Sequence, residues 1–189
     1  MTFEAFAVST GVVALGEIGD KTQLLTLVLA ARYRRPWTIA AAILVSTLLN
    51  HAAAAALGGW VTGLIAPNVL RWLLGASFLA MAAWMLVPDD LGKLDPEGGR
   101  MGVFVSTAVA FFLAEMGDKT QIATVMLAAR FDALIAVVAG TTLGMMIANV
   151  PAIWLGDSLM RRVPVAWVHR CAALVFAALG LLVLSGVGG

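Results

Sequence analysis

The stretch EIGDKTQ, residues 17–23, places a glutamate, an aspartate and a lysine inside an otherwise apolar segment that covers residues 5–31. A nearly identical stretch, EMGDKTQ, occupies residues 115–121, at a constant offset of 98 positions (115 − 17 = 98). The match continues beyond these strings, because LAAR at 29–32 recurs as LAAR at 127–130. Self-similarity of this extent indicates an internal duplication.

The composition is that of a membrane protein. Of the 189 residues, 61% are hydrophobic and only 12% are charged, whereas about 25% are charged in soluble proteins. Apolar segments of about 20 residues are needed to cross a hydrocarbon core about 30 Å thick. Six candidate segments lie at 5–31, 37–58, 69–87, 103–129, 133–156 and 166–186. We therefore predict an all-α integral membrane protein with six transmembrane helices.

The duplication divides the chain into two predicted three-helix repeats, residues 1–87 and 103–189, joined by an acidic cytoplasmic loop at 88–102. Because three spans is an odd number, the second repeat must enter the membrane from the side opposite to the first. The sequence therefore predicts an inverted repeat. Transporters of this architecture place their site near the bilayer midplane, at the repeat interface, often on interrupted helices.

The predicted orientation follows from the distribution of Lys and Arg between the two sides. Two of them, Arg71 and Arg130, fall on one side. Eight fall on the other side: Arg32, Arg34, Arg35, Lys93, Arg100, Arg161, Arg162 and Arg170. By the positive-inside rule the side with eight is cytoplasmic, so both termini are predicted to be extracytoplasmic.

The duplicated acidic residues lie deep in their predicted spans. Glu17 is 12 residues into the first span, which is about 18 Å at 1.5 Å per residue. In a continuous helix, the i, i+3 spacing would put Glu17 and Asp20 on one face, with Gln23 on the next turn. The second copy offers the same three side chains, Glu115, Asp118 and Gln121. Four carboxylates and two amides are thus predicted to converge as metal ligands.

The charges of the motif suggest what occupies this site. Four carboxylates contribute −4, and Lys21 with Lys119 returns +2, leaving −2. One divalent cation or two protons would neutralise this charge, and hard oxygen ligands favour Mg²⁺, Ca²⁺ or Mn²⁺ over copper or zinc. Lys21 follows Glu17 at i+4, so an intrahelical ion pair is expected to stabilise the empty site. In an alternative interpretation the motif lies in a short loop and caps the next helix.

The paired strings EIGDKT at 17–22 and EMGDKT at 115–120 resemble the Gdt family of calcium/manganese cation:proton antiporters, within the lysine-exporter superfamily. The resemblance covers the whole chain. It implies export of Mn²⁺ or Ca²⁺ in exchange for protons, with the carboxylates as ligands. Thr22 and Thr120 match the family's hydroxyl positions and are expected to support the site. The short chain, without the long extensions of organelle-targeted relatives, favours a prokaryotic inner membrane.

Other interpretations remain open at this stage. His51 corresponds by the 98-residue offset to Asn149, so either residue could be a ligand or a proton relay, or could form a hydrogen bond between helices. A passive divalent cation channel or uniporter is the alternative function. An intramembrane aspartyl protease is more remote, because each aspartate comes with a glutamate and a lysine.

We expect a divalent ion, protons and the lipid bilayer as partners, and we do not expect a nucleic acid. We also expect that the protein is not an enzyme and that it has no prosthetic group. The sequence leaves open the choice between Mn²⁺ and Ca²⁺, the proton stoichiometry and the oligomeric state.

Overall fold

The computed structural model describes residues 2–87, 102–155 and 164–186. The described residues form eight α-helices and no strand, which confirms the all-α prediction for them. The helices are α1 (Thr2–Glu17), α2 (Lys21–Tyr33), α3 (Pro36–Leu64), α4 (Pro67–Trp84), α5 (Val103–Glu115), α6 (Lys119–Phe131), α7 (Leu134–Leu155) and α9 (Val165–Ser185). The acidic loop predicted at 88–102 lies outside the described residues, except for Gly102.

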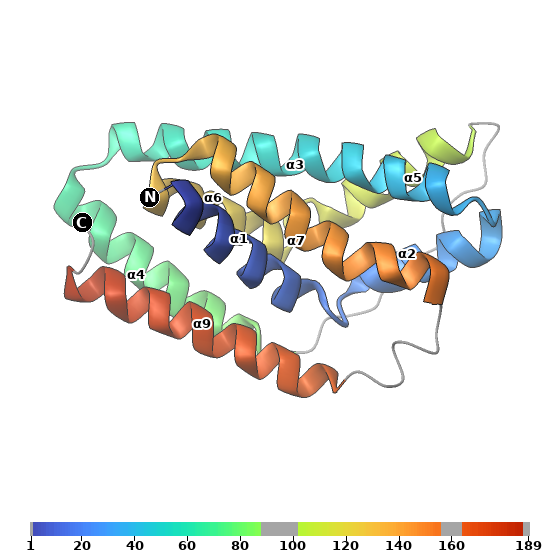
Figure 1. Ribbon diagram of the computed structural model, residues 1–189. Helices are drawn as coiled ribbons and strands as arrows, with labels where there is room; N and C mark the ends of the chain where they lie inside the picture. Colours follow the sequence, from blue (N-terminus) through green and yellow to red (C-terminus); the bar gives the residue numbers. More distant parts are fainter. Residues whose placement is uncertain (1, 88–101, 156–163, 187–189) are drawn as a thin grey trace.

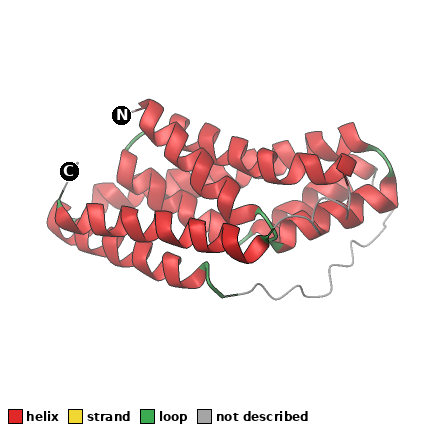
Figure 2. Ribbon diagram, turned by 60° about the horizontal axis from the view of Figure 1, so that its bottom comes forward, coloured by secondary structure: helices red, strands yellow, loops and turns green. Residues whose placement is uncertain are grey.

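Three of these helices, α3, α7 and α9, are long and apolar enough to cross a membrane by themselves. Their most apolar windows have mean hydropathies of 1.7, 1.7 and 2.0. Figure 2 shows the helices running along the length of one elongated bundle. In Figure 1, α3 runs along one edge of the bundle, α9 runs along the opposite edge, and α7 lies between them.

The first predicted span of each half is two helices and not one. In Figure 1, α2 continues across the bundle in the direction of α1, whereas α5 and α6 follow one another in the opposite direction. The breaks fall at Gly19, with φ +86°, and at Gly117, with φ +73°. Glycine adopts this left-handed conformation without steric cost, but a right-handed helix cannot continue through it.

The prediction that Glu17 and Asp20 share one face of a continuous helix is therefore wrong. The alternative, in which the motif lies in a short loop before a new helix, describes the local backbone, with Asp20 and Asp118 at the N-cap positions but without a side-chain capping hydrogen bond. Apolar residues continue on both sides of the motif. Hydropathy alone therefore predicts one membrane span and does not reveal the break.

Close helix packing depends on small residues. α1 packs along α7, α5 along α3, and α4 along α9. A Cβ on Gly140 or Gly144 of α7 would overlap backbone atoms of α1, so glycine permits the two helices to approach,. This contact brings the end of α1, and with it the first motif, beside the middle of α7.

Candidate metal centre

Each copy of the motif forms the same backbone break. Glu17 is the last residue of α1, and Asp20 is the N-cap of α2 with φ −80° and ψ 168°. Glu115 and Asp118 hold the same places at α5 and α6, where the Asp118 angles are −79° and 165°. In both copies the Asp amide donates to the Glu carbonyl oxygen, at 3.1 Å and 3.2 Å. Both aspartates thus lie at helix N-termini, where negative charge is favoured.

The two glutamines of the motif hold the break in place. Gly19 N donates to Gln23 Oε1 at 2.8 Å, and Gly117 N donates to Gln121 Oε1 at 2.7 Å. The Gln23 amide nitrogen donates to the Ala148 carbonyl oxygen at 2.6 Å. Gln121 Nε2 donates at 2.8 Å to the Asn50 side chain. Both ends of each glutamine amide, expected as a metal ligand, are therefore bonded to protein groups.

Three acidic side chains from both halves meet in the interior. Oxygen atoms of Glu17, Asp20 and Asp118 all lie within 4.8 Å of one another, and all three residues are buried. Among the described residues, Glu17 Oε1, Asp118 Oδ2 and the nearby motif hydroxyl of Thr120 have no hydrogen-bond partner. Buried carboxylate oxygens without partners are costly unless they are paired or bind a cation. This group of hard oxygen atoms fits a divalent metal ion.

The lysine of the first motif pairs across the two halves. Lys21 Nζ lies 3.1 Å from Asp118 Oδ1. The predicted i+4 pair with Glu17 requires one continuous helix, and the helix ends between these residues. The Thr22 hydroxyl donates to Glu17 Oε2. Lys119, which is buried, donates to the Val87 carbonyl oxygen at 3.0 Å.

The fourth predicted carboxylate, Glu115, has different neighbours. It is not part of the three-residue group. His51 Nε2 lies 2.9 Å from its Oε1 atom, and Asn50 Nδ2 donates to its Oε2 atom at 3.3 Å. Glu115 and His51 are both fully buried. The structure thus separates the two glutamates that the duplication makes equivalent in sequence.

Asn50 is a site residue that the sequence comparison missed. Its side chain joins Glu115 to Gln121 and also donates to the Phe112 carbonyl oxygen at 3.1 Å. Its counterpart in the duplication is Ala148, which has no polar side chain and instead offers its backbone carbonyl group to Gln23. An amide in the middle of an apolar span is itself a signal of function, with or without a matching residue.

The pair His51 and Asn149 is symmetric in sequence but not in its contacts. His51 reaches Glu115 of the second motif, as described above. The Asn149 side chain instead accepts from Thr26 Oγ1 of α2 at 3.0 Å and donates to the Met145 carbonyl oxygen at 3.1 Å. Asn149 thus accepts a hydrogen bond from a neighbouring helix, whereas His51 lies close to Glu115 without a hydrogen bond.

The two motifs also differ in how they are covered. His169 Nε2 of α9 lies 2.9 Å from the Ile18 carbonyl oxygen, so α9 lies against the first motif. In the second motif, Met116 is 55% exposed, and a Cβ on Gly117 would meet no atom of the described residues within 4 Å. Within the described part of the chain, the first motif is therefore covered by α9, whereas the Met116 and Gly117 side of the second motif is not covered.

This difference predicts unequal effects of alanine at the two glycines. Gly117→Ala should destabilise the protein by about 1–2 kcal/mol, the cost of a left-handed backbone at a residue with a Cβ. Gly19→Ala should destabilise it more, because its Cβ would also overlap the Val165 side chain. Thermal unfolding of the purified variants in detergent measures both effects.

The matched control is the double variant Gly19→Ala/Val165→Ala. It should recover the steric part of the loss but not the backbone part. Equal destabilisation by the two single variants would contradict the close contact between α9 and the first motif.

Comparisons with known proteins identify similar chains. The family model described as "Divalent cation/proton antiporter GDT1" matches residues 5–93 and 103–187. A Vibrio cholerae protein named "Putative manganese exporter" is 50% identical over 176 residues, covering 93% of this chain and 88% of that protein. A GDT1-like protein of Synechocystis is 28% identical over 193 residues, covering 91% of this chain and 92% of the relative. "GDT1-like protein 4" of Oryza sativa subsp. indica is 28% identical over 209 residues, covering 95% and 72%. No solved structure gives a significant match.

Proposed function

The chain belongs to the GDT1 family of divalent cation/proton antiporters, and from this premise we propose that it exports Mn²⁺ in exchange for protons. The choice of Mn²⁺ is supported by the Vibrio cholerae relative, which is named as a manganese exporter and is 50% identical. Ca²⁺ is the second candidate cargo, because it is bound by the same hard oxygen ligands. The family and these relatives are named as transporters or as members of the transporter family, in keeping with a role other than catalysis.

The metal is proposed to bind between Glu17, Asp20 and Asp118. The observation that carries this assignment is the approach of three buried carboxylates to within 4.8 Å of one another. The hydroxyl oxygen of Thr120 is a further candidate ligand, because it is buried without a partner among the described residues. Lys21 would leave Asp118 or share it when the ion enters. In this arrangement Gln23 and Gln121, with Thr22, hold the ligands in position.

Glu115 is proposed to act beside this site and not as a direct ligand in the conformation described. Its Oε2 atom accepts a hydrogen bond from Asn50 at 3.3 Å, and its Oε1 atom lies 2.9 Å from His51 Nε2. The carboxylate still adds negative charge to the low-dielectric interior in which the metal binds. It therefore contributes to the electrostatic balance of the site.

The architecture is proposed to be six membrane crossings in two inverted repeats. Support comes from the matching breaks at the two motifs and from the opposite directions of the α1–α2 and α5–α6 pairs in Figure 1. By the positive-inside rule, the side with more Lys and Arg is cytoplasmic, so both termini are proposed to be extracytoplasmic. The proposed membrane is the inner membrane of a prokaryote. Rocking of the repeats around the carboxylates would open the site to each side in turn.

Transport in inside-out membrane vesicles tests this function directly. Vesicles with an acidic lumen should accumulate Mn²⁺ from the medium, because protons leaving the lumen drive the metal inward. A protonophore should remove this accumulation. A panel of Mn²⁺, Ca²⁺, Mg²⁺ and Zn²⁺ measures the cargo preference. Equilibration of metal without dependence on the proton gradient would support the channel or uniporter and overturn the antiport proposal.

A further inference from the structure

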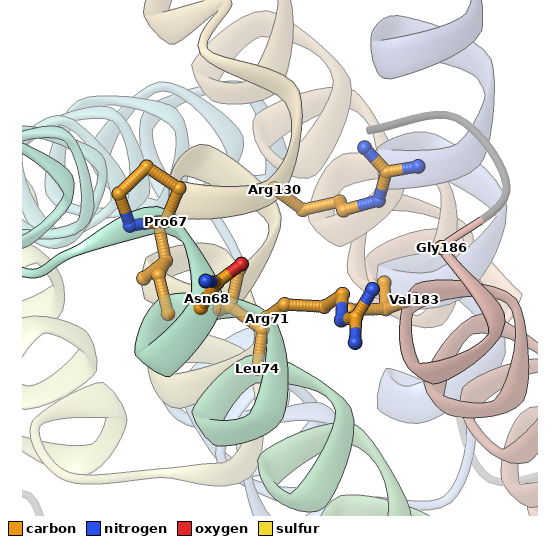
Figure 3. A pocket seen from close by; sticks show the side chains of 8 residues that line it. Pro67, Asn68, Arg71, Leu74, Arg130, Val183 and Gly186 are labelled. Atoms are coloured by element: carbon orange, nitrogen blue, oxygen red, sulfur yellow. The ribbon is translucent and has the colours of Figure 1, made fainter.

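The two basic residues predicted on the extracytoplasmic side, Arg71 and Arg130, meet in one pocket. The pocket has a volume of about 370 Å³ and lies between the start of α4, the end of α6 and the end of α9. Figure 3 shows both guanidinium groups projecting toward the same side of the pocket, where Val183 and Gly186 lie. Two cations that stand far apart in the sequence thus share one cavity.

Neither arginine has a carboxylate partner among the described residues. Arg71 lies over the Trp72 ring at 5.6 Å, and Arg130 lies over the Phe131 ring at 5.6 Å. The described residues that line the pocket include no acidic side chain, and their third polar side chain is the amide of Asn68. Two like charges facing one cavity repel each other unless an anion lies between them.

We propose that this pocket binds a phosphate-bearing anion between Arg71 and Arg130. The guanidinium group presents several N–H donors in one plane, which suits the oxygen atoms of a phosphate. The Asn68 amide offers a further donor, and the apolar wall of Leu74 and Val183 can hold a carbon chain next to the phosphate. The headgroup of an anionic phospholipid and a free phosphate ion share this chemistry.

The anion would join the two halves of the molecule. Arg71 belongs to α4 of the first half, and Arg130 belongs to α6 of the second. Arg130 is 12 residues along α6 from Asp118 (130 − 118 = 12), which places it about 18 Å from the metal ligands. The anion site is therefore separate from the carboxylate group and does not depend on the proposed cargo. Its occupation would hold α4 against α6.

Anion binding to the purified full-length chain tests the proposal. The protein in neutral detergent is titrated with inorganic phosphate, or with phosphatidylglycerol, and the unfolding temperature is recorded. Chloride at the same ionic strength and phosphatidylcholine are the reference additions. At least one of the two probes should raise the unfolding temperature of the unmodified protein. Arg71→Gln and Arg130→Gln should each weaken its apparent affinity by about tenfold or more, because each removes charge-assisted hydrogen bonds.

The matched control is Arg170→Gln, since Arg170 also lies over a ring, that of Trp167 at 5.3 Å, but outside this pocket. It should leave the affinity unchanged, and Arg71→Lys should retain part of it. A response to phosphatidylglycerol alone identifies a lipid headgroup, and a response to phosphate as well identifies a general phosphate site. Absence of both responses in the unmodified protein, or equal weakening by Arg170→Gln, would overturn the proposal.

Discussion

Glu17→Gln is expected to abolish Mn²⁺ transport and to weaken Mn²⁺ binding by about 100-fold or more, the scale of removing one partner from a buried charged site. Glu17 is fully buried and belongs to the group of three carboxylates. Glutamine keeps the size of the side chain and can still accept the hydrogen bond from Thr22, but it removes the negative charge. Metal binding to the purified protein and transport in vesicles measure the two losses.

The stability of this variant separates ligand loss from misfolding. Without metal, a neutral amide is easier to bury than a carboxylate, so Glu17→Gln should unfold at the same temperature as the unmodified protein or at a higher one. Glu4→Gln is the matched control, because Glu4 is an exposed acid on the same helix. It should leave both transport and binding unchanged. Near-normal Mn²⁺ binding by Glu17→Gln would contradict the proposed ligand set.

Glu115→Gln distinguishes the structure from the simple duplication. If the two glutamates were equivalent, both variants would lose the same affinity. Because Glu115 lies against His51 and Asn50 and outside the group of three carboxylates, we expect a smaller loss of Mn²⁺ affinity than for Glu17→Gln. The comparison requires only the two purified variants, measured under the same conditions.

The convergence of acidic side chains could be predicted from the sequence because it follows from the repeat itself. Of the four carboxylates predicted to converge, the structure brings Glu17, Asp20 and Asp118 within 4.8 Å of one another, and Glu115 is not part of this group. The helix break could not be derived in the same way. Apolar residues continue on both sides of the motif, so the apolar pattern alone predicts one span, and the backbone angle of +86° at Gly19 shows that the helix is broken.

The differences between the halves were beyond a comparison of the repeats. Duplication predicts equal surroundings, whereas His51 contacts Glu115 and Asn149 contacts Thr26. These contacts depend on how far each side chain reaches between packed helices, which the residue type alone does not determine. The partner of Lys21 was missed for a related reason, because an i+4 rule holds only inside one helix.

The second large effect concerns protons. The four carboxylates of the motifs and the two lysines sum to −2 when all are ionised. A buried charge of this size is costly without compensation, and a divalent ion or about two protons would compensate it. Mn²⁺ binding should therefore release up to about two protons, since metal and protons compete for the same oxygen atoms.

Calorimetry in buffers of different ionisation enthalpy counts these protons. Mn²⁺ affinity should weaken as pH falls, by up to about 100-fold per pH unit where two protons are exchanged, because each released proton contributes about tenfold. Asp118→Asn would leave a charge of −1 and deprive Lys21 of its partner. This variant should bind Mn²⁺ weakly and release fewer protons per ion.

A count of released protons near zero in the unmodified protein, with constant Mn²⁺ affinity from about pH 6 to about pH 8, would mean that proton exchange does not take place at these carboxylates. Coupling would then have to arise elsewhere in the chain, and the His51–Glu115 pair, which is equally buried, would be the next place to look for it.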